Sequence, residues 1–322
     1  MKSIYQILKP ARKGVRVTAA ALLLAMAGST AQAQMRWYVP RYITGDVGGG
    51  LQSIQFNPRD GKHKAGAGFQ LNGSAVFMFD AHWGVSAGIG VASYASKAKF
   101  NNMKESSVAY DTNLNARITD SSLMISPDYI FHTEFKNFTE KQKLLQIEIP
   151  ILAYYQFPIN GKFDVVGRAG FKFGIPVSSK YKLMSGTYET SAEFTDLKGN
   201  NLNVEIRNLP ASEMRKYGFS TVEADKEKGK CKLNPVNFSI MLEGGATYKI
   251  TKSLRAYAGI NFSYCLTNVH KESIEPILTS DRKYNGTLRS DRVDRASLIS
   301  VGASAGVIWD FWLAHYKTKP KF

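Results

Sequence analysis

The chain has 322 residues, of which 44% are hydrophobic and 12% aromatic, and it contains 27 glycines and two cysteines. Its formal net charge is +16, but five of the positive charges lie in the first 16 residues and three in the last six. The remaining basic residues are spread among acids, whereas a nucleic-acid-binding protein clusters them on one face. We therefore expect no nucleic-acid partner.

The first 33 residues have the order of a signal peptide. An apolar stretch from Val17 to Gly28 follows the basic residues, and small residues end at Ala31-Gln32-Ala33, which predicts cleavage after Ala33. The apolar stretch is shorter than the roughly 20 residues of a spanning helix, and no later segment supplies such a run. We expect a signal peptide at 1–33, a β-barrel at 34–316 and a short basic tail at 317–322.

Alternation of apolar and polar residues predicts an all-β chain. In the final segment, odd positions such as Val301 and Val307 are apolar, while even positions such as Ser300 and Ser304 are small and polar. A soluble sandwich would show the same alternation, but these segments exceed the usual five or six residues of soluble strands. The predicted strands are Ile43–Phe56, Gly68–Phe79, Trp83–Tyr94, Leu144–Phe157, Phe163–Ile175, Val236–Ile250, Leu254–Leu266 and Leu298–Leu313.

The connections between these segments alternate in length. Three are tight, at Asp80–His82, Pro158–Gly161 and Thr251–Lys252. The others are longer and fall on the opposite side, as in a barrel inserted from one side. We therefore predict an eight-stranded antiparallel transmembrane β-barrel with short periplasmic turns and long external loops, in a Gram-negative outer membrane. Aromatic residues near the strand ends suit an interfacial girdle: Phe77, Phe79, Trp83, Tyr155, Phe157, Trp309, Phe311 and Trp312.

Two segments of the long connections also look like strands. Ser122–Phe135 and Asn203–Leu209 are either β-hairpin arms above the membrane or extra barrel strands, which would make ten. Charged residues such as Asp128 and Glu205 interrupt any apolar face, so we favour arms.

Short motifs on these strands resemble a known family. Leu145-Gln146-Ile147-Glu148-Ile149-Pro150-Ile151-Leu152-Ala153-Tyr154-Tyr155 is similar to the "LEIPLLLKY" strand of the outer-membrane β-barrel family of Bacteroidota, which includes PorT-like and OmpX-like proteins. Gly167-Arg168-Ala169-Gly170-Phe171-Lys172-Phe173-Gly174 resembles the Gly-aromatic strand that follows it. The resemblance to PorT-like proteins implies a link to type IX secretion.

The end of the last predicted strand resembles the signal read by the barrel-assembly machinery, with Gly306, Trp309 and Phe311 as its Gly-aromatic-aromatic positions. It departs from the usual case because Lys317–Phe322 follows it. The resemblance implies this machinery as a partner during insertion.

Charged residues also fall on the inward parity. The interior of an eight-stranded barrel is just wide enough for side chains to fill, and buried charges need partners. We expect an ion-paired lumen, with a gated ion path as the alternative. The predicted lumen charges are Asp46, Glu148, Glu243 and Asp310 with Arg168, Lys172, Lys249 and Arg255.

The other chemistry-bearing residues form no recognisable motif. Cys231 and Cys265 are either a disulfide, as an oxidising compartment allows, or two free thiols. The five histidines lack metal-ligand spacing, and no nucleophile elbow, phosphate loop or CxxC is present. We expect no catalytic residues, no metal and no cofactor.

The patterns together favour a structural or surface-interaction role carried by the external loops. The expected partners are outer-membrane lipid and an unknown surface ligand or protein partner. The alternatives are a small-solute channel, which needs unpaired and hydrated lumen charges, an accessory of a secretion system, and a loop-borne enzyme, which needs convergent titratable groups in the loops.

Overall fold

A computed structural model describes residues 41–110, 125–196, 201–207, 219–223, 227–281 and 283–311. The predicted cleavage residues Ala31 and Ala33, the tail 317–322 and Trp312 lie outside these ranges. None of the described helices is long and apolar enough to cross a membrane.

All described strands belong to one 13-stranded sheet, whose neighbouring strands are antiparallel. One short 3-10 helix, η1 (Thr287–Arg289), lies in the connection before the last strand. The strands are β1 (Tyr42–Phe56), β2 (Gly61–Ala65), β3 (Ala67–Met78), β4 (Trp83–Phe100), β5 (Met103–Tyr110), β6 (Ile125–Pro158), β7 (Phe163–Asp196), β8 (Asn201–Ile206), β9 (Thr221–Glu223), β10 (Lys228–Lys230), β11 (Asn237–Lys249), β12 (Leu254–Cys265) and β13 (Ala296–Asp310).

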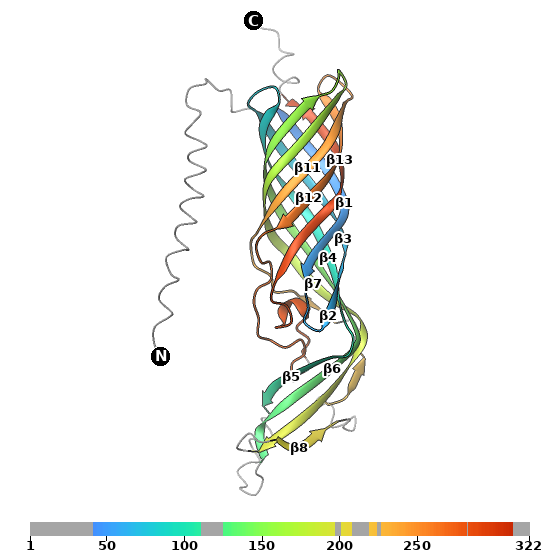
Figure 1. The fold of residues 1–322 in the computed structure, drawn as a ribbon, viewed down its shortest axis with the longest axis vertical. Coiled ribbons are helices and arrows are strands. Elements are labelled where there is room, and N and C mark those ends of the chain that lie inside the picture. The colour runs from blue at the N-terminus through green and yellow to red at the C-terminus, as the bar shows by residue number, and fades with distance from the viewer. Residues whose placement is uncertain are drawn as a thin grey trace, which may run out of the picture. The chain divides into compact units, whose positions relative to one another are not determined.

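The long strands follow one another in a closed circuit of pairings. From β1 the path runs through β3, β4, β6, β7, β11 and β12 to β13, which pairs back with β1. These strands wrap into a tilted cylinder (Figure 1). Each predicted strand overlaps one of them, so the all-β antiparallel prediction is confirmed.

The side chains of this circuit separate by parity as alternation predicted. Leu242 on β11 is 52% exposed and Ile260 on β12 is 73% exposed, whereas Ser239 and Ser263 on the same strands are buried. Successive strand residues point to opposite faces, so the apolar set lies outside and the polar set inside.

The three tight turns are held by their own side chains. Asp80 Oδ1 accepts hydrogen bonds from the N–H groups of His82 and Trp83, and Asn160 Oδ1 accepts those of Lys162 and Phe163. Thr251 Oγ1 accepts hydrogen bonds from the N–H groups of Ser253 and Leu254, where β12 begins. Side chains of this kind favour turns because they satisfy local backbone donors.

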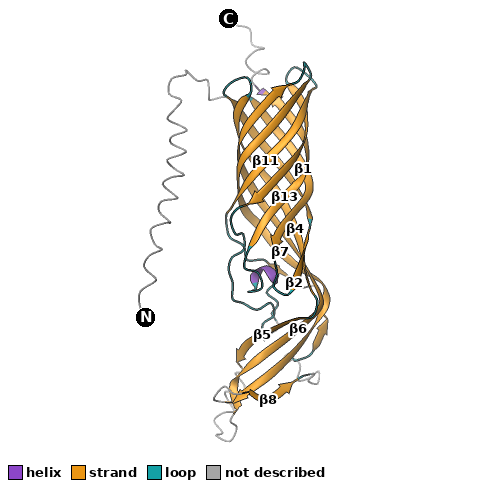
Figure 2. Cartoon of the chain, viewed as in Figure 1, coloured by secondary structure: helices purple, strands orange, loops and turns teal. Residues whose placement is uncertain are grey.

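Two of the long connections, those that follow Ser96 and Pro176, are largely strand and not loop. β6 and β7 are 34 residues long and continue past the cylinder, where they pair with each other and with β5, β8, β9 and β10 (Figure 2). We call this part the β6–β7 extension. The short strands that pair with β6 and β7 here lie in other parts of the chain. The sequence of β6 and β7 alone, in which charges interrupt the apolar alternation, therefore did not reveal the extension.

Both strand-like segments of the connections lie in this extension. The described part of Ser122–Phe135 belongs to β6 and pairs with β5, while β8 contains most of Asn203–Leu209 and pairs with β7. Neither pairing is part of the closed circuit, as expected for arms.

A bulge lies in β7 and not at Pro150 of the facing strand β6. Pro150 stays in register opposite Lys172. The register instead shifts between Leu145, opposite Ser178, and Gln146, opposite Pro176. The extra residue is Val177, and just beyond it the even-numbered side chains of Lys180, Lys182 and Met184 face outward. A second irregularity near Gly186 returns later even positions, such as Tyr188 and Ala192, to the buried side.

The closed circuit predicts that the first and last strands can be joined covalently. Val47 lies directly opposite Ala305, so a Val47→Cys/Ala305→Cys variant with both native cysteines changed to serine should form a disulfide on mild oxidation. Directly opposite Cβ atoms lie about 4.5–5.5 Å apart. The measurement is the mobility of the unfolded chain on a gel before and after reduction.

A Val47→Cys/Ile260→Cys variant is the matched control, since β12 lies two strands from β1. Cross-linking of the control but not of the Val47/Ala305 pair would contradict the circuit.

Candidate functional site

The inner face of the cylinder carries a chain of buried ion pairs. Near its middle, Arg168 Nη1 lies 3.5 Å from Asp46 Oδ2 and 3.4 Å from Glu243 Oε2. Tyr257 donates to Glu243 at 2.7 Å, and its ring lies beneath the guanidinium, with 5.1 Å from Cζ to the ring centroid. All these side chains are at most 7% exposed.

A second buried pair lies towards the extension. Lys172 Nζ is 2.9 Å from Glu148 Oε2, and Glu148 Oε1 also accepts hydrogen bonds from Tyr94 and Gln146 at 2.8 and 2.7 Å. Lys172 further donates to Ser263 at 3.2 Å. Each charge therefore has several polar partners besides its counter-ion.

Towards the tight turns, the pairs include two residues that sequence reasoning left out of the network. Arg255 and Lys249 both pair with Asp164, and Asp310 pairs with Arg41 at 3.4 Å. Asp164 has the same parity as Arg168 in the predicted strand Phe163–Ile175, so its role could have been found. The position of Arg41, just before β1, carried no such signal.

All eight predicted lumen charges thus lie in ion pairs on the inner face. Breaking a buried pair leaves an uncompensated charge and costs several kcal/mol, about 3–5. Some lumen donors still bond to no protein atom, namely Arg168 Nε and Nη2 and Asn261 Nδ2. The arrangement therefore fills the lumen with paired charge.

The connection between β12 and β13 covers the inner face at the extension end. Val269, Ile277, Leu278, Tyr284, Leu288 and Val293 are at most 5% exposed. They belong to one apolar cluster with strand residues such as Ile54, Phe100 and Leu144. We call residues 266–295 the cap segment.

Two buried carboxylates hold the cap segment in place. Glu140 on β6 accepts hydrogen bonds from the Thr287 N–H at 2.9 Å, from the Thr287 hydroxyl and from Tyr284. Glu105 on β5 accepts the Ile277 N–H at 3.0 Å and pairs with Arg292 at 3.2 Å. Burial raises the pKa of both carboxyl groups. The hydrogen bonds act in the opposite direction but do not cancel the effect of burial. No local sequence signal joins residues so far apart in the chain.

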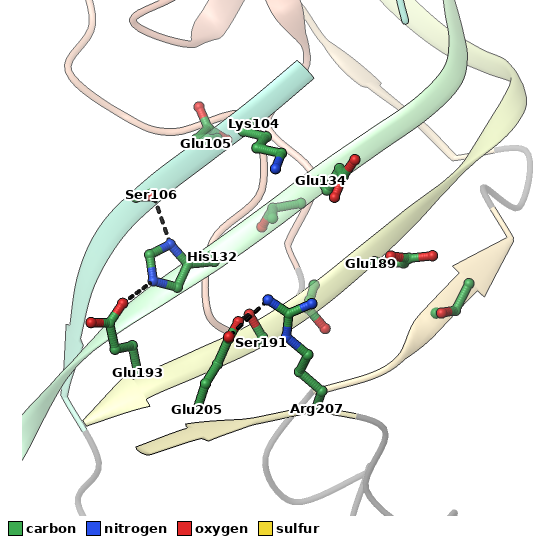
Figure 3. A pocket seen from close by; sticks show the side chains of 13 residues that line it. Lys104, Glu105, Ser106, His132, Glu134, Glu189, Ser191, Glu193, Glu205 and Arg207 are labelled. Atoms are coloured by element: carbon green, nitrogen blue, oxygen red, sulfur yellow. Dashed lines mark hydrogen bonds and ion pairs between the residues drawn. The ribbon is translucent and has the colours of Figure 1, made fainter. Parts of the chain in front are cut away.

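The outward face of the extension forms a polar groove of about 380 Å³. Ser106 Oγ lies 2.8 Å from His132 Nδ1, and His132 Nε2 lies 2.8 Å from Glu193 Oε2 (Figure 3). Beside this row, Glu205 accepts from Ser191 at 2.6 Å and pairs with Arg207 at 2.7 Å. Titratable groups of both signs therefore converge on this face.

The serine–histidine–glutamate row differs from a hydrolase triad. In such triads the serine bonds Nε2 and the acid bonds Nδ1, whereas the order here is reversed. Ser106 also lies directly opposite His132, and His132 opposite Ser191, in the sheet register. The row is a ladder of cross-strand hydrogen bonds, which stabilises neighbouring strands.

The remaining predicted residues are spread over the fold. Cys231 and Cys265 are free, buried thiols, so the disulfide alternative is not formed. The Cys231 N–H bonds Ser179 O while Cys265 lies opposite Ser239, which places the two in different strand pairings. Gly306 lies opposite Asp46, and the Trp309 and Phe311 rings are 5.3 Å apart. Their role in assembly stays a prediction.

Residues 31–271 match the family described as outer membrane protein beta-barrel domain. The chain belongs to this family. Its location in the outer membrane, predicted from the strands and turns, is thereby confirmed. No curated protein matches the chain.

Several solved outer-membrane structures are similar to this barrel. Neisserial surface protein A (NspA) is 12% identical, with a TM-score of 0.34, covering 84% of this chain and 96% of its own. Ail of Yersinia pestis is 10% identical, with a TM-score of 0.26, covering 83% and 98%. The translocator domain of NalP from Neisseria meningitidis is 8% identical, with a TM-score of 0.24, covering 93% and 97%.

Removing Arg168 should strongly destabilise the barrel. Arg168→Met leaves Asp46 and Glu243 buried without their cation, so we expect a loss of about 3–5 kcal/mol in the free energy of unfolding. Adding Asp46→Asn and Glu243→Gln should recover much of it. The measurement is urea unfolding of the protein in detergent micelles, followed by tryptophan fluorescence.

Arg59→Met provides the matched control, because Arg59 pairs with Asp294 and both side chains are more than half exposed. Its effect should stay below about 1 kcal/mol. Equal losses for Arg59→Met and Arg168→Met would refute a stabilising lumen network.

Proposed function

We propose that this outer-membrane protein is an eight-stranded, non-conducting barrel whose β6–β7 extension carries a surface-interaction role outside the cell. The observation that carries this proposal is that the barrel lumen is filled and covered, while the β6–β7 extension continues beyond it. Paired charges fill the lumen, and the cap segment covers its end. This architecture therefore does not favour the passage of solutes.

The outer surface of the cylinder supports a transmembrane placement. Apolar side chains such as Leu71, Ile89, Ile151 and Ile260 are 46–73% exposed, as lipid-facing residues of a barrel are. Aromatic rings lie near the tight turns, including Trp83 beside Tyr155 with centroids 4.6 Å apart. Such rings suit the membrane–water interface.

The β6–β7 extension supports the interaction role because its surface is built on strands and not on loops. Its two main strands run without interruption from the barrel wall, and aromatic side chains such as Phe131 and Phe194 bury its inner face. Sites built on strands hold their side chains more firmly than sites on loops. The polar groove on its outward face would then meet a surface ligand.

A small-solute channel is the second candidate, since unpaired lumen donors such as Arg168 Nη2 could bind water. In a planar lipid bilayer we expect the wild-type protein to give no steady conductance. A variant carrying Asp46→Ser, Arg168→Ser and Glu243→Ser removes only the central charges, so the Lys172–Glu148 pair and the cap segment should keep it closed as well. Heat-dependent gel mobility checks that both are folded. Steady, ion-selective conductance by the wild-type protein would favour the channel.

The extension should be reachable from outside intact cells. Val108 on β5 is 78% exposed, whereas the native cysteines are buried. A Val108→Cys variant should therefore react with a membrane-impermeant maleimide on whole cells, as read by mass shift. Ile159→Cys, in an exposed tight turn, is the matched control and should react only after the outer membrane is permeabilised. The opposite pattern would reverse the proposed orientation.

A further inference from the structure

Ten lysines gather on the outward face where the barrel meets the extension. They come in pairs from five neighbouring strands, and we call them the lysine belt: Lys62 and Lys64 on β2, Lys97 and Lys99 on β4, Lys141 and Lys143 on β6, Lys180 and Lys182 on β7, and Lys228 and Lys230 on β10.

The sheet register aligns these lysines across the strands. One row of five is directly opposed, running through Lys64, Lys97, Lys141, Lys182 and Lys228. A second row joins Lys143, Lys180 and Lys230, and Lys62 lies opposite Lys99. Directly opposed side chains are close neighbours, so the belt is one continuous basic surface.

Parity and the β7 bulge turn the whole belt outward. The lysines are exposed, apart from the partly exposed Lys141, while the residues between them, such as Ala98, Gln142 and Tyr181, are buried. In the first half of β7 the even-numbered side chains point inward. Without the extra residue at Val177, Lys180 and Lys182 would therefore point inward as well. The bulge therefore completes the belt.

The lysine belt takes no part in the ion pairs that the described residues form. Further along this face of the extension, Lys136 pairs with Glu189 at 2.8 Å, and acids become common. Like charges directly opposite one another destabilise a sheet, so the belt calls for an external anion.

The belt lies next to the lipid-facing surface on the same strands. On β6, Leu145 follows Lys143 outward and Ile149 and Ile151 continue the apolar face. On β7, Ile175 is 41% and Val177 60% exposed, just before Lys180. The lysines therefore begin where exposed apolar side chains end, at the level of lipid head groups.

We propose that the lysine belt binds phosphate groups of glycolipid head groups in the outer leaflet. Lysine is a compact cation that binds phosphate as a point charge, and basic clusters beside a membrane-spanning segment attract anionic lipids. Several aligned rows would hold several phosphates, neutralising the repulsion within the sheet. The inference rests on the proposed orientation, which places the extension outside.

The test compares lipid-dependent stability of two matched variants in detergent micelles. One changes the five-lysine row to glutamine at Lys64, Lys97, Lys141, Lys182 and Lys228. The control changes Lys162, Lys232, Lys252, Lys271 and Lys283, all outside the belt. The probes are bis-phosphorylated lipid A and its dephosphorylated form. The readout is the midpoint temperature of the heat-dependent gel shift over a range of lipid concentrations.

Bis-phosphorylated lipid A should raise the midpoint of the wild-type protein and of the control, and the dephosphorylated form should not. In the five-lysine variant the half-maximal lipid concentration should rise at least about tenfold. Without lipid and at low salt, this variant should be the more stable, because it lacks the repulsion within the row.

An unchanged response of the five-lysine variant, or an equal response to dephosphorylated lipid A, would overturn the proposal. So would an equal midpoint shift with phosphatidylglycerol or with soluble heparin, which would assign the belt to phospholipid or to a polysaccharide. If the five-lysine variant fails to fold, Lys141→Gln/Lys182→Gln is compared in its place. Cysteine labelling at Val108 separately reports whether the orientation itself is wrong.

Discussion

A membrane offers no hydrogen-bonding partners to the backbone, so every N–H and C=O group at membrane depth must pair within the sheet. Pairing of β1 with β13 meets this demand by closing the circuit of strands. Closure fixes the number of strands around the cylinder and hence the width of its interior. The inner face, the outer face and the two ends of the molecule all follow from it.

A narrow interior sets the chemistry of the inward side chains. Arg168 is held between two carboxylates and two tyrosine rings, because a buried cation without partners would be costly. At the extension end, the cap segment takes over and apolar packing replaces ion pairs. Glu105 and Glu140 provide acceptors for backbone N–H groups of the cap segment that packing alone would leave unsatisfied.

The outer face changes its character along the same two strands. From the tight turn onward, β6 presents aromatic rings, then aliphatic side chains, then lysines, and finally the charges of the polar groove, while β7 passes from exposed apolar side chains to lysines and then to the groove. This order matches the surroundings that a strand meets as it leaves a bilayer: interface, hydrocarbon, head groups and water. One continuous pair of strands thus supports both the membrane anchor and the extension.

The sequence by itself determined the strands of the barrel, the tight turns and the inward position of charges such as Arg168 and Glu243, because side-chain alternation and turn chemistry are local properties. It did not reveal that Asp310 pairs with Arg41, that Glu140 binds Thr287, or that β6 and β7 continue as one extension. Those features depend on the register between strands distant in sequence, which barrel closure sets. The one-residue shift at Val177 moves the side chains of Lys180 and Lys182 to the outer face, so only the tertiary structure could place the lysine belt.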